Sequence, residues 1–172
     1  MKKIFQAMAR YNGNVNKEVM VILGGMPADK LMVKTKAYFP TIMDSVLHLL
    51  KSDIGLLKRF NTAFPESKAL GSPLMAADPD VLRKEAEADL KKYFQYRGEI
   101  DAIINQFVGE LDDEALERSF KFVNYKGEAT ETAVWKILLT IFNHQTHHRG
   151  GLSVMLELED VKNDFSGTLA RI

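Results

Sequence analysis

Apolar side chains recur every three or four positions through most of the chain, which is the pattern of helices that bury one face. The first stripe runs through residues 4–22, and Gly24, Gly25 and Pro27 end it. A second stripe spans Ala37 to Phe60. The stretch 61–77 holds two prolines, a glycine and several small residues, so a long connection is expected there.

A third helix is expected to begin at Asp78 and Pro79, because Asp caps helices well and Pro fits the first turn. It should run to about Leu111, with Gly98 as a weak point in its middle. Between residues 116 and 130, aromatic and polar positions alternate before a turn signal at Lys126, which predicts a small β-hairpin.

The last helix is expected to start near Thr130 or Thr132 and to reach about Leu158. Four long amphipathic helices bury their stripes best against each other, so the predicted class is all-α, a four-helix bundle. The connections before the third and fourth helices are long enough to cross the bundle. Residues 1–172 are read as a single domain, and residues 160–172 as an irregular tail packed over the body or a partner.

Composition excludes several classes of function. The 23 basic and 23 acidic side chains among 172 residues give a net charge of zero, so no basic face for a nucleic-acid partner is expected. No apolar run approaches the roughly 20 residues of a membrane span. The N-terminus lacks the apolar stretch of a signal peptide. The chain has no cysteine, which excludes disulfides and thiolate metal sites and leaves a cytoplasmic location as the default.

Histidines are the most informative polar side chains in the last helix. At about 100° per residue, His144 and His148 lie within about 40° of each other, inside the apolar arc. His147 falls about 60° off, at the edge of that arc. An inward pair one turn apart is suited to chelating one ion. Two other readings stay open: each ring is a core histidine bonded to a neighbour, or the pair serves as acid and base without a metal.

The second helix gives a less direct signal. His48 shares its arc with Asp44 and Ser52, opposite most of the apolar stripe, so periodicity alone predicts a surface histidine. Asp53 falls inside the apolar arc, where a carboxylate is costly unless it is paired. Its expected role is either to hold a neighbouring helix or to support a ligand histidine by a hydrogen bond.

These segments together resemble the DinB-like (YfiT-like) family of metal-dependent enzymes. Residues 143–150 (NHQTHHRG) match its signature on the last bundle helix, and residues 48–53 (HLLKSD) match its His-x4-Asp segment. Residues 11–16 (YNGNVN) are similar to its N-terminal segment. The chain differs at Gly151, where the family commonly has Gln, and at Asn14, where it commonly has Trp.

The resemblance implies a metal triad of His48, His144 and His148, which overrules the surface reading of His48. It also implies a crossed four-helix bundle, often dimeric, so a homodimer is expected. Zinc or nickel is the expected divalent ion, with iron or manganese as further candidates. Relatives include thiol-dependent S-transferases, a mycothiol-dependent isomerase and proteins described as hydrolases.

The expected function is therefore a divalent-metal-dependent enzyme. Three neutral imidazoles leave a coordination position open, as in catalytic sites. The expected partner is a small-molecule substrate, for S-transfer a low-molecular-weight thiol; hydrolysis is the other reaction considered. Arg149 is a candidate for binding a substrate carboxylate. The alternative is a non-catalytic metal-binding or dimeric stress-response bundle, with Asp44 as a possible fourth ligand.

Overall fold

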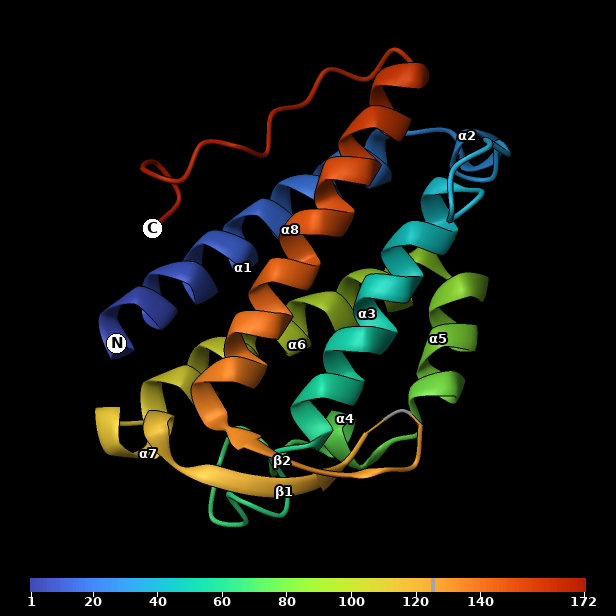
Figure 1. Cartoon of the computed structure of the whole chain (residues 1–172). Helices are drawn as coiled ribbons and strands as arrows, with labels where there is room; N and C mark the ends of the chain where they lie inside the picture. The colour runs from blue at the N-terminus through green and yellow to red at the C-terminus, as the bar shows by residue number, and fades with distance from the viewer. Residues whose placement is uncertain (125) are drawn as a thin grey trace.

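Four long helices surround one core in the computed structural model, which describes residues 1–124 and 126–172 (Figure 1). The all-α prediction is confirmed. The long helices are α1 (Lys2–Gly25), α3 (Ile42–Lys58), α6 (Leu90–Glu110) and α8 (Val134–Leu158). The shorter helices are α2 (Ala28–Leu31), α4 (Pro73–Ala76), α5 (Pro79–Ala88) and α7 (Asp113–Glu117).

Each long helix packs on two of the others: α1 on α6 and α8, and α3 on α6 and α8. The core between them is filled by fully buried side chains such as Val15, Leu50, Ile100 and Ile141. Because α3 and α6 run in the same direction, the chain must return along the bundle between them, and α5 makes this return while packing on both (Figure 1). The predicted crossover is therefore present.

The second helix begins five residues later than expected from Ala37. The residue before a proline is disfavoured in helical conformation, and Pro40 stands just before the start. Thr41 then caps α3: its side-chain oxygen accepts a 3.0 Å hydrogen bond from the backbone N–H of Asp44 and its hydroxyl donates to the Asp44 carboxylate. This cap fixes where the helix begins, and with it the direction of every later side chain.

The predicted third helix is two helices, which corrects the sequence interpretation. The break lies at Asp89, whose backbone is extended and whose side chain caps α6 by accepting from the N–H of Lys91. Gly98, the expected weak point, lies inside an unbroken α6. An internal cap, more than an isolated glycine, ends a helix because it satisfies the free N–H groups of the next one.

The predicted hairpin is confirmed as β1 (Ser119–Val123) paired antiparallel with β2 (Ala129–Ala133), with Phe120 opposite Thr132. Gly127 takes the left-handed φ of 81° that the turn requires. Because β2 reaches Ala133, α8 begins at Val134, later than predicted. Tyr125, which the alternating pattern included in the hairpin, lies outside the described residues.

The tail after α8 turns back and runs alongside α1 (Figure 1). The Arg171 guanidinium binds both carboxylate oxygens of Glu18 at 2.7 and 2.8 Å, and the Asn14 side chain donates to the Arg171 carbonyl. The Tyr11 hydroxyl donates to the Phe165 carbonyl. The irregular tail therefore packs over the body, as predicted. Among the described residues, no helix has the length and apolarity that a membrane crossing requires.

Candidate metal centre

Three histidine rings meet between α3 and α8. The ring nitrogens of His48, His144 and His148 that could serve as ligands all lie within 4.8 Å of one another. The Nε2 atoms of His48 and His144 are 3.1 Å apart, and the ring centroids are 4.3 to 5.1 Å apart. We call these three residues the histidine triad. Three imidazoles at this spacing are suited to sharing one transition-metal ion.

Helix geometry accounts for two of the three positions. His144 and His148 lie one turn apart on α8 and project from the same face of that helix. His147 is exposed and lies outside the triad, although its ring is 4.9 Å from that of His148. The face predicted for His144 and His148 is therefore the one that the structure shows.

The third position corrects the periodicity argument. His48 was predicted on the surface from its arc on the helix, but it is half-buried and touches His144. The side of α3 opposite its apolar stripe is covered by Phe39, which stacks on His48 at 4.4 Å between ring centroids and meets His148 edge-on at 5.4 Å. The residues just before α3 fold over this edge, which the periodicity of α3 could not show.

The triad sits in surroundings that keep its rings neutral. Burial, followed by the neighbouring rings, lowers the pKa of His144 to about 4, and the same causes lower the pKa of His148 to about 4. Burial also lowers the pKa of His48, with smaller effects of Arg83 and Lys51. A neutral imidazole has a free lone pair, which a metal ligand needs.

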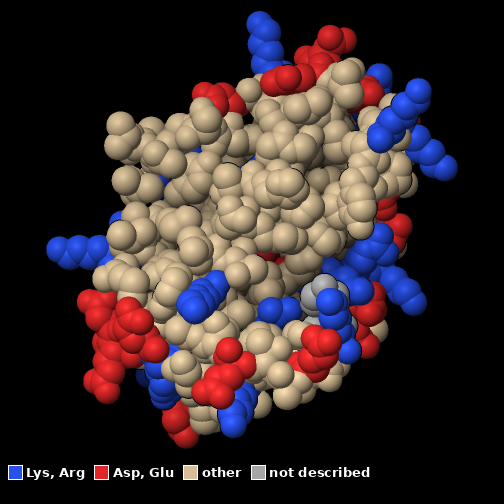
Figure 2. Space-filling model, in the orientation of Figure 1, with Lys and Arg blue, Asp and Glu red and all other residues tan. Residues whose placement is uncertain are grey.

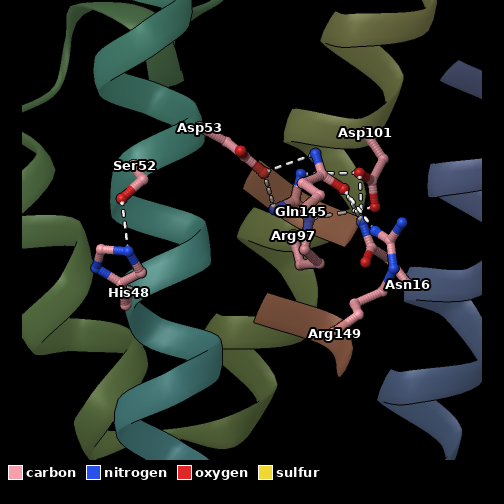
Figure 3. Close-up of polar contacts among 8 residues, drawn as sticks. All are labelled: Asn16, His48, Ser52, Asp53, Arg97, Asp101, Gln145 and Arg149. Carbon is pink, nitrogen blue, oxygen red and sulfur yellow. Dashed lines mark hydrogen bonds and ion pairs between the residues drawn. The ribbon is translucent and has the colours of Figure 1, made fainter. Parts of the chain in front are cut away.

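Asp44, considered above as a fourth ligand, is engaged elsewhere. Its carboxylate accepts from the Thr41 hydroxyl at 2.7 Å and lies 3.7 Å from Arg83. No carboxylate among residues 1–124 and 126–172 joins the triad. The nearest hydroxyl is that of Ser52, whose Oγ lies 3.4 Å from His48 Nε2 (Figure 3). The protein therefore offers three donors and leaves the rest of a coordination sphere open.

Of the two roles predicted for Asp53, its contacts show the first, which is to hold neighbouring helices. Its Oδ2 accepts from Arg97 of α6 at 2.6 Å and from Gln145 of α8 at 2.9 Å (Figure 3). Arg97 also binds both oxygens of Asp101, at 2.8 and 3.2 Å. Asn16 of α1 donates to Asp101 at 2.9 Å. These buried groups tie all four long helices together, next to the triad.

We call this set the buried ion network. Burial raises the pKa of Asp53 to about 6, although Arg97 opposes the rise. Arg149 reaches the network only by donating to Gln145 Oε1 at 3.0 Å, and its guanidinium extends toward α1 (Figure 3). It is placed on the far side of α8 from the histidines. Arg149 therefore lies apart from the triad, and its binding of a substrate carboxylate stays a prediction.

Sequence reasoning missed three contributors to this region. Phe39 was counted as part of a helical stripe, whereas it is the cover of the triad. Arg97 and Asp101 passed unnoticed, although two opposite charges four residues apart on the apolar face of a helix are a readable signal of a buried pair. Gly151, where the family commonly has Gln, is exposed and open around its Cα.

Comparison with known proteins agrees with this picture. The model of the DinB family matches residues 1–159. Among curated proteins, the chain is similar to Protein DinB of Bacillus subtilis (strain 168), with 24% identity over 147 residues, which is 85% of this chain and 80% of that protein. No solved structure gives a significant match. The three-histidine group is compatible with a metal-binding protein of this kind.

Proposed function

The chain belongs to the DinB family, and from this premise we propose that it is a divalent-metal-dependent enzyme whose ion is held by His48, His144 and His148. The observation that carries the proposal is the convergence of three ring nitrogens within 4.8 Å, from two helices that are far apart in sequence. Two of these residues alone would chelate weakly, whereas three from packed helices form a preorganised site.

The donor set fits a transition metal. All three donors are imidazoles held neutral by burial, and this donor type suits zinc, nickel, copper and iron better than calcium or magnesium. The Nδ1 atom of His144 is buried and has no partner among the described residues. Its Nε2 lies 3.1 Å from His48 Nε2, so the ring is oriented by packing and by this contact.

A divalent ion held by three neutral ligands supplies Lewis acidity, which ionises a bound thiol or water near neutral pH. The protein's own contribution is to exclude water and to fix orientation. Phe39 covers two of the rings, and the Ser52 hydroxyl stands next to His48, where it can hydrogen-bond to a bound substrate. We propose transfer of a low-molecular-weight thiol to an electrophilic carbon as the reaction. The new C–S bond forms as the leaving group departs, and the thiol proton passes to solvent.

Metal stoichiometry tests the site directly. We expect the protein purified without a histidine tag to carry about one transition-metal ion per chain, measured by elemental analysis. His144→Ala and His148→Ala should lose the ion, because two imidazoles bind far more weakly than three. His147→Ala is the matched control, since His147 is a neighbouring but exposed ring. Equal retention of metal in all three variants would exclude this assignment.

Activity is tested with the loaded protein on a panel of small thiols paired with electrophilic acceptors. A rate that requires both metal and thiol supports S-transfer. Ester or amide cleavage without a thiol would point to hydrolysis at the same site. If the metal is bound and both panels are silent, the enzyme proposal fails while the metal site stands.

A further inference from the structure

A cavity lies on the opposite face of α8 from the histidine triad. It has a volume of about 930 Å³, lies between α1, α8 and the tail, and is open to solvent on one side. Thr146, Gly150 and Ser153 line it from α8. At about 100° per residue these positions lie about 180° to 240° around the helix from His144. The cavity is therefore separated from the triad by α8 itself, and its size is that of a small-molecule site.

The walls of this cavity are mostly apolar. Ile4, Ala7 and Met8 line it from α1, and Phe165 and Ile172 line it from the tail. The tail is held against α1 by the Arg171–Glu18 ion pair and by the bond from the Tyr11 hydroxyl to the Phe165 carbonyl. In Figure 2 the central and upper part of this face is mostly uncharged, and the charged side chains lie around its rim.

Arg149 is the exception in this apolar wall. Its side chain is 2% exposed, lines the cavity and has no carboxylate within ion-pair distance among residues 1–124 and 126–172. One nitrogen donates to Gln145, a second lies 3.5 Å from the Thr146 hydroxyl, and the buried Nε has no acceptor among the described residues. The guanidinium carbon also lies 5.3 Å from the centre of the Tyr11 ring, a cation–π contact that leaves its charge without a counter-ion. Both ion pairs of the buried ion network belong to Arg97 instead. A buried guanidinium without a direct counter-ion is costly.

We propose that this cavity binds an amphipathic organic carboxylate, whose head group pairs with Arg149 and whose apolar body fills the space between α1, α8 and the tail. A planar carboxylate matches the fork of N–H donors on a guanidinium. The apolar walls would take up a hydrocarbon chain. The site does not use the histidine triad, so the inference stands independently of the proposed function.

The other charged residues at the cavity are consistent with one anion. Lys3 adds a positive charge. The Asp164 carboxylate accepts from the Ser166 backbone N–H and hydroxyl at 2.8 and 2.6 Å, so it is engaged within the tail. Glu157 lies on the exposed side of α8, where solvent screens its repulsion. Arg149 is thus the charge that is both buried and available.

Binding is tested by titrating the purified full-length protein with decanoate and with 1-decanol, which has the same apolar body without the charge. Isothermal calorimetry is run before and after metal removal with EDTA. We expect saturable binding of one decanoate per chain, at least about tenfold tighter than decanol, because the ion pair is made in a site shielded from water. Metal removal should leave the decanoate affinity unchanged.

Two glycines of α8 offer a matched pair of variants. A Cβ added at Gly150 meets no atom within 4 Å, and Gly150 lines the cavity, so the larger side chain of Gly150→Leu should fill part of it and block decanoate. Gly151 is equally open but does not line the cavity, so Gly151→Leu should bind as the unchanged protein does. Neither change touches the buried ion network, and both suit a helix.

Arg149→Leu completes the test. It should weaken decanoate by about tenfold or more and leave decanol within about threefold. Circular dichroism of each variant checks that it is folded. If Arg149→Leu does not fold, Gly150→Leu still tests the proposal. The proposal is overturned if decanoate shows no saturable binding up to about millimolar concentration, if decanol binds equally well, or if binding disappears with EDTA. Unchanged binding in Gly150→Leu would also overturn it.

Discussion

The histidine triad and the buried ion network belong to the same bundle, but they differ in how far their polar atoms are hydrogen-bonded within the protein. Asp53, Arg97 and Asp101 are 8% exposed or less and are joined by hydrogen bonds of 2.6 to 3.2 Å. The triad rings are half-buried, and burial lowers the pKa of each. The Nε2 atom of His48 meets only His144 Nε2 and the Ser52 hydroxyl among the described residues. Figure 3 shows His48 with Ser52 alone, apart from the network.

This difference indicates a structural role for the buried ion network and a binding role for the histidine triad. The network uses most of its donors and acceptors on the protein itself, so it holds α1, α3, α6 and α8 in register. The triad rings contact mainly one another and the Ser52 hydroxyl, so their nitrogens are available to an ion that they could share. Polar side chains that are fully hydrogen-bonded fix the geometry of the bundle. Polar side chains with free donors or acceptors can bind a ligand. Four predictions test this contrast, from the largest expected effect to the smallest.

Arg97→Met should be the most destabilising change. It leaves the carboxylates of Asp53 and Asp101 buried without their cation, and breaking a buried pair in this way costs about 3–5 kcal/mol. Urea denaturation measures the loss. Arg83→Met is the control, because Arg83 makes only long surface contacts of 3.5 and 3.7 Å, worth about 0.5 kcal/mol or less. Similar losses for the two variants would remove the structural role of the network.

Zinc should stabilise the protein through the triad alone. At about one hundred times its dissociation constant, an ion bound only by the folded state adds about 2.7 kcal/mol. This gain should disappear in His48→Ala, His144→Ala and His148→Ala, while these variants stay folded without metal. Thermal unfolding with and without zinc measures it. A full zinc effect in His48→Ala would mean that α3 contributes no ligand.

Thr41→Ala should cost about 1 kcal/mol, because it removes the oxygen that caps α3 at the N–H of Asp44. Thr140→Ala is the matched control: the Thr140 hydroxyl donates back to the Lys136 carbonyl within α8 and caps nothing. Urea denaturation compares the two. An equal effect of both changes would show that the start of α3 is fixed by packing alone.

Acid should affect the two clusters in opposite directions in the metal-free protein. Because burial lowers the pKa of His144 and His148 from 6.5 to about 4, the unfolded state takes up protons first and stability falls as pH drops from about 6.5 to 4. The pKa of Asp53 is raised to about 6, so its protonation in the folded state increases stability as pH falls below 6. These slopes oppose each other, so Asp53 offsets part of the stability that the two histidines lose as pH falls toward 4.

A double variant separates the two slopes. In His144→Gln/His148→Gln the histidine contribution is absent, so stability should fall less, or rise, between pH 6.5 and 4 compared with the unchanged protein. Urea midpoints across this range are the measurement. Identical pH profiles would mean that the rings are not held neutral by the fold.

The sequence alone determined the elements whose evidence is local. Apolar periodicity located α1 and α8, the alternation before α8 located the hairpin, and one-turn spacing placed His144 and His148 on a common face with His147 off it. It missed the break at Asp89, because the apolar pattern continues across that residue and only the capping bond ends the helix. The homodimer and the cytoplasmic location stay predictions.

Only the tertiary structure decided which residues pack against each face of a helix. Periodicity gives the direction of a side chain from its own helix axis, but the partner found there depends on how helices cross and where connections fold. His48 points away from the apolar stripe of α3 and still meets His144, because α8 and the segment carrying Phe39 lie over that edge. Arg149 follows His148 by one residue, yet it turns about 100° around α8 to a different cavity.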